Sequence, residues 1–295
     1  MKTDNIFVSS LCIYPVKSCR GIHVNSWEIN RYGFKYDRFW TIINKNDNKI
    51  LTQRELPKLA LIAPRIDELN SELILSAPEV QDLHLPLLPK KEFCKKYQID
   101  LWGDQVIGYC CGDEAANWLT NFLKVSASLL FKSNEDTRII RKNLPKGIDF
   151  QPETAFADTF PFLITSEESL HDLNGRLSEP VTFRNFRPNI VVKGCSKSFE
   201  EDTWKEIIIG TDKENIFYVS CRSTRCIVPN VNPDTGIRNK LEPSKTLSSY
   251  RRVDLGAKYH ACFGMNVIHS KSGIVLSVGD PVTVLTIGEH IREKY

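Results

Sequence analysis

Residues 223–236 read STRCIVPNVNPDTG and follow directly on a β-type run at 216–221. Asn, Pro, Asp and Gly crowd the second half of this stretch, which is the composition of a turn-rich loop. Cys226 therefore follows a strand, beside Arg225, in a place where ligand contacts are common. A nearby cation lowers the pKa of a thiol, and the thiolate is a soft ligand for transition metals. The residues alone leave two interpretations open, a reactive thiol or an inert buried cysteine.

Short β-type runs lie on both sides of this stretch and predict a mainly β protein with a few helices, of the α+β class. In the first hundred residues they fall at 6–14, 39–43, 59–63 and 72–76. Further on they fall at 190–193, 207–209, 216–221, 274–278 and 282–286. Runs of this length between turn residues predict a compact antiparallel domain followed by a β-barrel-like domain.

Two segments have the periodicity of amphipathic helices. In 113–124 the apolar residues fall on one face, and Asp113 is the predicted N-cap. A second helix is predicted over 166–177, where Thr165 and Glu168 have the spacing of a capping box.

The chain of 295 residues is long enough for two domains. Residues 132–157 are polar and without periodicity, so they are predicted to be a linker. We accordingly expect an N-terminal β domain over 1–135 and a second domain over 136–288.

Composition excludes several classes of protein. An apolar fraction of 41% and a charged fraction of 25% are those of a folded globular chain. The net charge of +3 is too small for a typical nucleic-acid-binding protein, so no nucleic-acid partner is expected. No apolar run approaches the ~18 residues of a membrane span, and no leader pattern opens the sequence. A cytoplasmic monomer is the expectation.

The cysteines and histidines do not form a recognisable metal or disulfide pattern. Nine cysteines are present without a C-x-x-C pair, and the six histidines are scattered. A disulfide framework and a structural zinc site are therefore not expected.

Basic and hydroxyl residues recur where predicted strands end. Lys17 and Ser18 lie in YPVKSCRG (14–21), Arg38 in YDRFW (36–40), and Arg187 with Asn189 in NFRPNIVV (185–192). If Lys17, Arg38, Arg187 and Arg225 converged, they would suit a phosphate dianion, because arginine offers forked donors and lysine a point charge. Each alone is more often an ordinary surface or capping residue.

Several of these strings occur together in a fixed order. They are YPVKSCRG, DRFW followed by LTQRELPKLALI (51–62), NFRPNIVV, STRCIVPNVNPDTG, and FGMN (263–266) followed by GIVLSVGDPV (273–282). In this order they resemble the N-terminal β domain and the MOSC domain of the amidoxime-reducing molybdenum enzymes, and the resemblance covers residues 8–288. Ordered motifs are more specific than any one of them.

The resemblance implies a mononuclear molybdenum cofactor on one pterin dithiolene, with Cys226 as the protein ligand to the metal and the centre of catalysis. The other implied cofactor contacts are Lys17, Ser18, Arg38, Thr159, Phe160, Arg187, Asn189, Thr224, Arg225 and Asn266. Two positions depart from the animal members, because Phe160 replaces a serine and Asn266 stands where a tyrosine is common. The second difference puts that one contact in doubt.

The implied reaction is the two-electron reduction of N-hydroxylated compounds such as amidoximes and hydroxylamines. Asp234 is a candidate for proton delivery, although a turn residue in N-P-D-T-G is the favoured interpretation. The sequence has no G-x-G-x-x-G motif, no iron–sulfur cysteine spacing and no haem-attachment motif, so electrons must come from a partner. In the eukaryotic family that partner is a small b-type haem cytochrome served by an NADH-dependent flavin reductase. The family also adds the mitochondrial outer membrane as an alternative location.

Two other functions stay open at this point. A molybdenum-cofactor carrier or cofactor-modifying protein without reductase activity would share the domain, since MOSC domains also occur in cofactor sulfurases. In a third interpretation no metal is bound, and Cys226 carries sulfane sulfur. The fold by itself does not choose between them.

Overall fold

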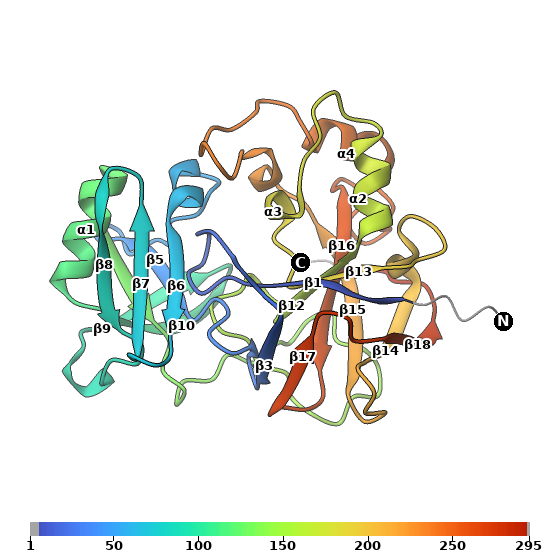
Figure 1. The fold of residues 1–295 in the computed structure, drawn as a ribbon, viewed down its shortest axis with the longest axis horizontal. Helices are drawn as coiled ribbons and strands as arrows, with labels where there is room; N and C mark the ends of the chain where they lie inside the picture. Colours follow the sequence, from blue (N-terminus) through green and yellow to red (C-terminus); the bar gives the residue numbers. More distant parts are fainter. Residues whose placement is uncertain (1–5, 294–295) are drawn as a thin grey trace.

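The computed structural model describes residues 6–293. Its main feature is an eight-stranded sheet in the order β18-β14-β15-β16-β12-β13-β1-β2 (Figure 1). β12 and β13 pair in parallel, and the other neighbours are antiparallel. The strands are β18 (Val282–Ile287), β14 (Trp204–Ile209), β15 (Ile216–Thr224), β16 (Cys262–His269), β12 (Phe162–Ser166), β13 (Ile190–Lys193), β1 (Phe7–Ile13) and β2 (Ile22–Val24).

This sheet curls back on itself. Phe7, at the start of β1, forms a bridge with Pro281, and the amide of Val282 donates to the carbonyl of Ile6 at 2.8 Å. The first residues of β1 therefore lie beside the start of β18, at the other side of the sheet. The expected mainly β fold with a barrel-like second part is confirmed.

Three smaller sheets complete the β structure. A four-stranded sheet runs β5 (Trp40–Asn44), β11 (Ala127–Phe131), β10 (Asp104–Cys110) and β9 (Lys96–Leu101). Two three-stranded sheets contain β17 (Ile274–Ser277), β3 (Ser26–Asn30) and β4 (Gly33–Phe34), and β6 (Ala63–Asp67), β7 (Glu72–Ala77) and β8 (Val80–Pro86). The predicted strand at 59–63 is wrong, because Pro57 opens a 3-10 turn over Pro57–Leu61.

Two large apolar cores lie under these sheets. One packs α1 (Asp113–Leu123) against the sheets of the first half and includes Trp40, Leu119 and Leu129. The other lies inside the curled sheet and includes Phe162, which meets Phe217 edge-on at 5.9 Å. Figure 1 shows the two halves side by side, with α2 (Glu167–Asn174), α3 (Phe183–Phe186) and α4 (Ser244–Tyr250) on the larger sheet's side.

The two predicted helices are confirmed, but their caps are wrong. α1 begins at Asp113 after Gly112, and no side chain caps it. In α2 the cap is Ser166, whose hydroxyl accepts from the amide of Ser169 at 3.2 Å. Thr165, the residue expected to cap the helix, is still part of β12 and therefore does not cap it. Glu168 instead accepts from the amide of Gly194 at 2.9 Å.

The segment predicted as a linker is packed into the molecule. Residues 132–157 form no helix or strand of their own, yet Arg138, Ile140 and Phe156 in it are buried. A bridge between Ile139 and Glu153 ties its two ends together. The segment therefore forms part of a wall between the two halves. β1 pairs with β13, so one sheet contains strands from both sides of the predicted domain boundary.

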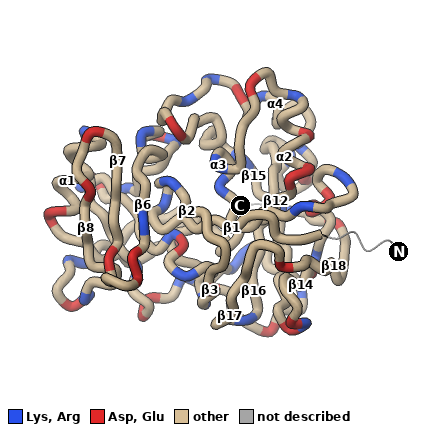
Figure 2. The backbone as a smooth tube through the Cα atoms, in the orientation of Figure 1, with Lys and Arg blue, Asp and Glu red and all other residues tan. Residues whose placement is uncertain are grey.

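Among residues 6–293, none of the helices combines the length and the apolar content that crossing a membrane requires. Lysine, arginine and acidic residues are interspersed along both halves (Figure 2).

His269 provides a pH-dependent contribution to stability. Burial lowers its pKa from 6.5 to about 4, despite the contact of Nε2 with the carbonyl of Asn30 at 2.7 Å. The unfolded chain therefore takes up this proton first, so stability is complete above about pH 6.5 and is lost as the pH falls towards 4. At pH 5.5 the free energy of unfolding should be lower than at pH 7.5 by about 1.4 kcal/mol from this group.

Urea unfolding of the wild type and of His269→Gln at both pH values checks this prediction. The pH-dependent loss should be smaller in the variant by that amount. An equal loss in both proteins would assign the effect to other groups, such as the buried His290.

Candidate functional site

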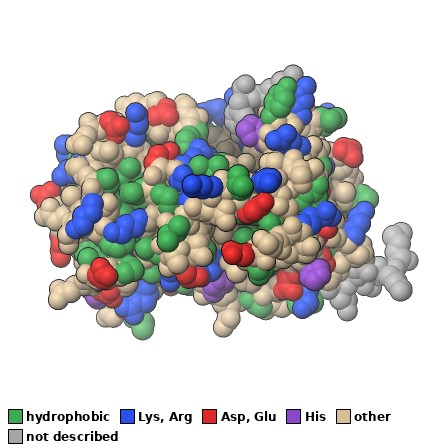
Figure 3. Space-filling model, turned by 90° about the horizontal axis from the view of Figure 1, so that it is seen from above, with side chains coloured by type: hydrophobic (Ala, Val, Ile, Leu, Met, Phe, Trp, Pro, Cys, Tyr) green, Lys and Arg blue, Asp and Glu red, His purple; other side chains and the backbone are tan. Residues whose placement is uncertain are grey.

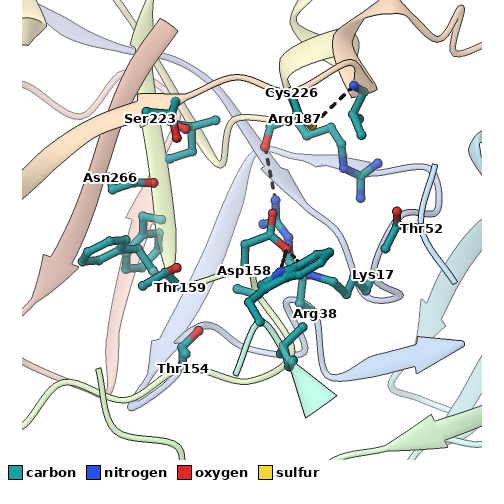
Figure 4. Close-up of a pocket in the computed structure, with 18 of the residues that line it drawn as sticks. Lys17, Arg38, Thr52, Thr154, Asp158, Thr159, Arg187, Ser223, Cys226 and Asn266 are labelled. Carbon is teal, nitrogen blue, oxygen red and sulfur yellow. Dashed lines mark hydrogen bonds and ion pairs between the residues drawn. The ribbon is translucent and has the colours of Figure 1, made fainter. Parts of the chain in front are cut away.

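A cavity of about 680 Å³ lies between the two halves of the molecule. All eleven site residues predicted from the sequence line it: Lys17, Ser18, Arg38, Thr159, Phe160, Arg187, Asn189, Thr224, Arg225, Cys226 and Asn266. They come from the β1–β2 loop, the approaches to β5, β12 and β13, the end of β15 with the residues just after it, and the middle of β16. Labelled side chains from these elements surround one space in Figure 4, and Figure 3 shows basic and apolar side chains near a hollow of the surface.

The cavity is strongly basic although the chain is nearly neutral. Nine of its lining residues are lysine or arginine and two are aspartate. The net charge of the whole chain is only +3. Like charges gathered in a cleft produce a field that attracts anions.

Two of the arginines are held against one tyrosine. The guanidinium carbons of Arg38 and Arg187 each lie 4.3 Å from the centre of the Tyr14 ring. Arg38, Arg187 and Ser18 all have positive φ values, of 47°, 61° and 66°. Such backbone costs about 1 kcal/mol or more for a non-glycine residue and is concentrated at functional sites. The fold therefore holds the Arg38 and Arg187 side chains in place before a ligand binds.

Asn189 makes its side-chain hydrogen bonds to other residues of the protein. Its Oδ1 accepts from Arg38 at 2.9 Å, and its Nδ2 donates to Asp37 at 3.0 Å and to the carbonyl of Cys12 at 3.1 Å. Asp37 in turn forms an ion pair with Arg38 at 2.6 Å. Asn189 thus fixes the position of Arg38 and joins β1 to the approach of β13.

Replacing Asn189 with alanine should lower the free energy of unfolding by about 1–3 kcal/mol, because buried polar partners lose their hydrogen bonds. Urea unfolding measures this loss. Asn70→Ala is the matched control, because Asn70 is exposed and donates from its Nδ2 and its own backbone amide to the Asp67 carboxylate. Equal stabilities of the two variants would contradict the role assigned to Asn189.

Lys17 and Asp158 form an ion pair in the cavity wall, and Nε1 of Trp102 donates to the same carboxylate oxygen at 2.9 Å. Burial lowers the pKa of Lys17, an effect that the charge of Asp158 opposes. Burial also raises the pKa of Asp158, but the charge and hydrogen bond of Lys17 and the bond from Trp102 lower it well below its usual range. The Asp158 carboxylate is therefore charged at neutral pH.

Cys226 lies half-buried two residues after the end of β15, with the amide of Val228 3.5 Å from its sulfur. Arg54 lies beside the thiol. Burial lowers the pKa of Arg54, but a hydrogen bond to Cys226 and the charge of its thiolate raise it overall. The thiol is therefore accessible from the cavity and faces a cation.

Among the described residues of the cavity wall, two arginines each have a buried Nη2 atom without a hydrogen-bond partner. They are Arg187 and Arg225, although Nε of Arg225 donates to the carbonyl of Phe263 at 3.0 Å. Burial lowers the pKa of Arg225 to about 10, which leaves it charged at neutral pH. Unpaired buried donors of this kind are costly unless an anion accepts from them. A ligand with a phosphate group and a metal fits this donor set, since Cys226 supplies a thiolate in the same wall.

The remaining predicted residues have different environments. Phe160 is buried against Cys221 and Ile268, so its side chain packs into the wall. Nδ2 of Asn266 lies 3.5 Å from the sulfur of Cys221. Asp234 is absent from the cavity lining in the described part of the chain and forms an ion pair with Arg184 at 2.7 Å. Its position therefore favours the turn interpretation over proton delivery.

Sequence reasoning missed Arg54, Trp102 and Asp158, which all line the cavity. Arg54 lies within the LTQREL part of a motif that carries the family resemblance, and Asp158 directly precedes the predicted contact Thr159. Trp102 lies in a tight turn after β9 and has no motif around it.

Comparison with known proteins agrees with this architecture. The MOSC N-terminal beta barrel domain matches residues 5–126, and the MOSC domain matches residues 151–283. Mitochondrial amidoxime reducing component 2 of Bos taurus is 41% identical over 93% of this chain and 82% of its own length. The Homo sapiens component 2 is also 41% identical, and component 1 is 39% identical over 94% of this chain and 82% of its own length. The chain therefore belongs to the family of amidoxime-reducing components.

Proposed function

We propose that this protein is a molybdenum-cofactor-dependent reductase of N-hydroxylated compounds. One observation carries the proposal: a cysteine thiol and two unpaired buried arginine nitrogens share the wall of one basic cavity. The names of the relatives, which describe amidoxime reduction, support the same reaction.

The residues have distinct roles in this proposal. Cys226 supplies the protein thiolate to the metal. Arg187 and Arg225 hold the phosphate of the cofactor through forked donors, and Lys17 and Arg38 add charge to the same anion site. Ser18, Thr159, Phe160, Asn189, Thr224 and Asn266 complete the contacts around the cofactor, with Asn189 acting by fixing Arg38.

The reaction breaks an N–O bond and forms an N–H bond. An N-hydroxylated substrate takes up two electrons and two protons, and it releases the unhydroxylated compound and one water molecule. When bound, the cofactor supplies a metal that can change its oxidation state by two electrons. The chain orients the substrate and holds the surrounding cations, whose field stabilises negative charge at the reacting end.

The electrons are proposed to come from a small b-type haem cytochrome and its NADH-dependent flavin reductase. The sequence has no dinucleotide fingerprint and no cysteine spacing for a cluster. Contacts between redox partners are usually small, transient and steered by charge. The basic cavity mouth would suit an acidic partner surface. A cytoplasmic location and a monomeric state stay predictions.

Metal analysis followed by an activity assay tests the proposal. The purified protein, loaded with molybdenum cofactor, is mixed with benzamidoxime and reduced viologen, and benzamidine formation is measured. Turnover with bound molybdenum supports the reductase. Bound molybdenum without turnover would favour a cofactor carrier or modifying protein, and a protein that cannot bind molybdenum would favour a sulfur-carrying thiol.

We further expect that NADH alone will not drive turnover. NADH should support benzamidoxime reduction only with the cytochrome and its reductase present, and the rate should fall as salt screens the contact. The viologen-driven rate should be much less sensitive to salt. Fast NADH oxidation at its absorbance band without any partner would contradict this prediction.

A further inference from the structure

A second cavity, of about 250 Å³, lies beside the main one and shares Arg187 with it. Its wall comes from β1, the β1–β2 loop, β2, α3 and the loop at 231–233. A water molecule takes up about 30 Å³ in the liquid, so this space has room for a small ligand together with some water.

The wall of the second cavity is positively charged. Arg20, Arg184 and Arg187 line it, and none of its described lining residues is acidic. Asp234 pairs with Arg184 at 2.7 Å and lies 3.7 Å from Arg20. Three guanidinium groups and one carboxylate leave two positive charges, and a dianion would neutralise them. A cleft lined by charge of one sign attracts such an ion.

Two of these arginines are oriented by the loop that follows Cys226. The carbonyl of Pro233 accepts from Arg20 at 3.3 Å and from Arg184 at 3.1 Å. The carboxylate of Asp234 adds the ion pairs to both, but it is 65% exposed, so solvent screens its charge. The loop therefore fixes the two guanidinium groups before a ligand binds, and it cancels only part of their charge.

Two donor atoms at this cavity are buried and lack a hydrogen-bond partner among residues 6–293. They are Nε of Arg20 and Nη2 of Arg187. An Nη atom carries two N–H groups, so Nη2 of Arg187 can donate to a ligand in either cavity. Arg20 is not among the described residues that line the main cavity, so its Nε can serve the second cavity alone. A buried unpaired donor costs free energy, and an anion that accepts from it removes this cost.

We propose that the second cavity binds a small tetrahedral dianion of the phosphate class, held by Nε of Arg20 and Nη2 of Arg187. Arginine suits such an ion because its N–H groups form a rigid fork that can contact two oxygens at once. The two positive charges left on the wall favour a dianion over a monoanion. This inference goes beyond the proposed function and does not depend on bound molybdenum.

Calorimetric titration of the full chain with inorganic phosphate, at constant ionic strength and about pH 8, measures the binding. Arg20→Gln should weaken it roughly ten- to a hundredfold, because a charge-assisted hydrogen bond is lost. Arg20→Lys should recover part of the affinity, since lysine restores the charge without the Nε donor. Acetate, which is a monoanion, should bind the wild type more weakly than phosphate.

Arg225→Gln is the matched variant for the main cavity. Arg225 also has a buried Nη2 without a partner among the described residues, but it lines the main cavity and not the second one. Phosphate that binds in the main cavity would be lost in Arg225→Gln and kept in Arg20→Gln. The binding that Arg20→Gln weakens should therefore be unchanged in Arg225→Gln.

Nuclear magnetic resonance gives a readout at the donor atom itself. The side-chain Nε–H signal of Arg20 is assigned by its disappearance in Arg20→Gln. In the labelled wild type this signal should shift as phosphate is added, and the shift should follow the same saturation curve as the heat of binding. A side chain that only stabilises the loop would not show that curve.

Three results would overturn the inference: phosphate affinity of Arg20→Gln within twofold of the wild type, acetate binding as tightly as phosphate, or an Arg20 signal that does not move at saturating phosphate. Failure of the proposed function has a different signature. In that case benzamidoxime would not be reduced with viologen, while the phosphate titrations, which need no turnover, would still decide whether the second cavity holds the anion.

Discussion

Cys226→Ser is expected to abolish N-reduction while the protein remains folded. A hydroxyl is a harder and far less acidic ligand than a thiol, so the metal would lose its protein thiolate. Losing a residue that hydrogen-bonds to a metal ligand already lowers metal affinity or activity roughly 10–100-fold. Losing the ligand itself should therefore lower kcat by about a hundredfold or more. Viologen-driven benzamidoxime reduction and molybdenum content measure the two consequences separately.

The matched control is Cys94→Ser. Cys94 is another partly exposed thiol, but it lies beside a 3-10 turn before β9 and outside the residues that line the cavity. This control should retain wild-type turnover. Near-normal activity of Cys226→Ser with a full complement of molybdenum would show that the thiolate is not the protein ligand.

Arg187→Ala should reduce cofactor occupancy more than it reduces turnover per bound molybdenum. Its Nη2 has no hydrogen-bond partner among residues 6–293, whereas Nη1 donates to the carbonyl of Cys19. Loss of a charge-assisted contact costs about 1.5–3 kcal/mol, which corresponds to roughly ten- to a hundredfold in affinity. Molybdenum content after extended dialysis and the rate per molybdenum together separate binding from catalysis.

Arg184→Ala is the control for that experiment. Arg184 lies three residues earlier, on α3, and its guanidinium pairs with Asp234 at 2.7 Å instead of lining the main cavity. Thermal unfolding of both variants checks that the fold is intact, because Arg187 also lies over the Tyr14 ring. Full occupancy of Arg187→Ala after dialysis would mean that this side chain does not hold the anion.

Some of the architecture followed from local pattern. Short runs between turn residues identified β1, β5, β7, β13, β14, β15, β17 and β18. The 3.6-residue periodicity of 113–124 identified α1, since a helix that packs on one face must repeat its apolar residues at that spacing. β12 and β16 were missed, because a strand buried on both faces has no alternation to show.

The helix caps show the limit of local reasoning. Thr165 and Glu168 have the right spacing, but β12 extends through Ser166 and pairs with β13 and β16. The hydrogen bonds between β12 and its neighbouring strands decide where the helix can begin. Those bonds depend on residues far away in the sequence. A cap worth about 1 kcal/mol does not override them.

Eleven site residues could be named from ordered motifs, because the order of short strings along a chain is itself a property of the sequence. Periodicity shows which face of a strand is buried but not which residues lie beside it. It therefore could not predict that these eleven residues line one cavity. Arg38 and Arg187 meet over Tyr14 only because β1 pairs with β13, and Trp102 reaches Arg54 and Asp158 only because a hairpin tip turns into the cavity. Residue types and their order therefore determined the family and the candidate chemistry. Long-range strand pairing decided which cations lack a partner and what stands beside the thiol, because those contacts join residues as far apart in the sequence as Phe7 and Lys193.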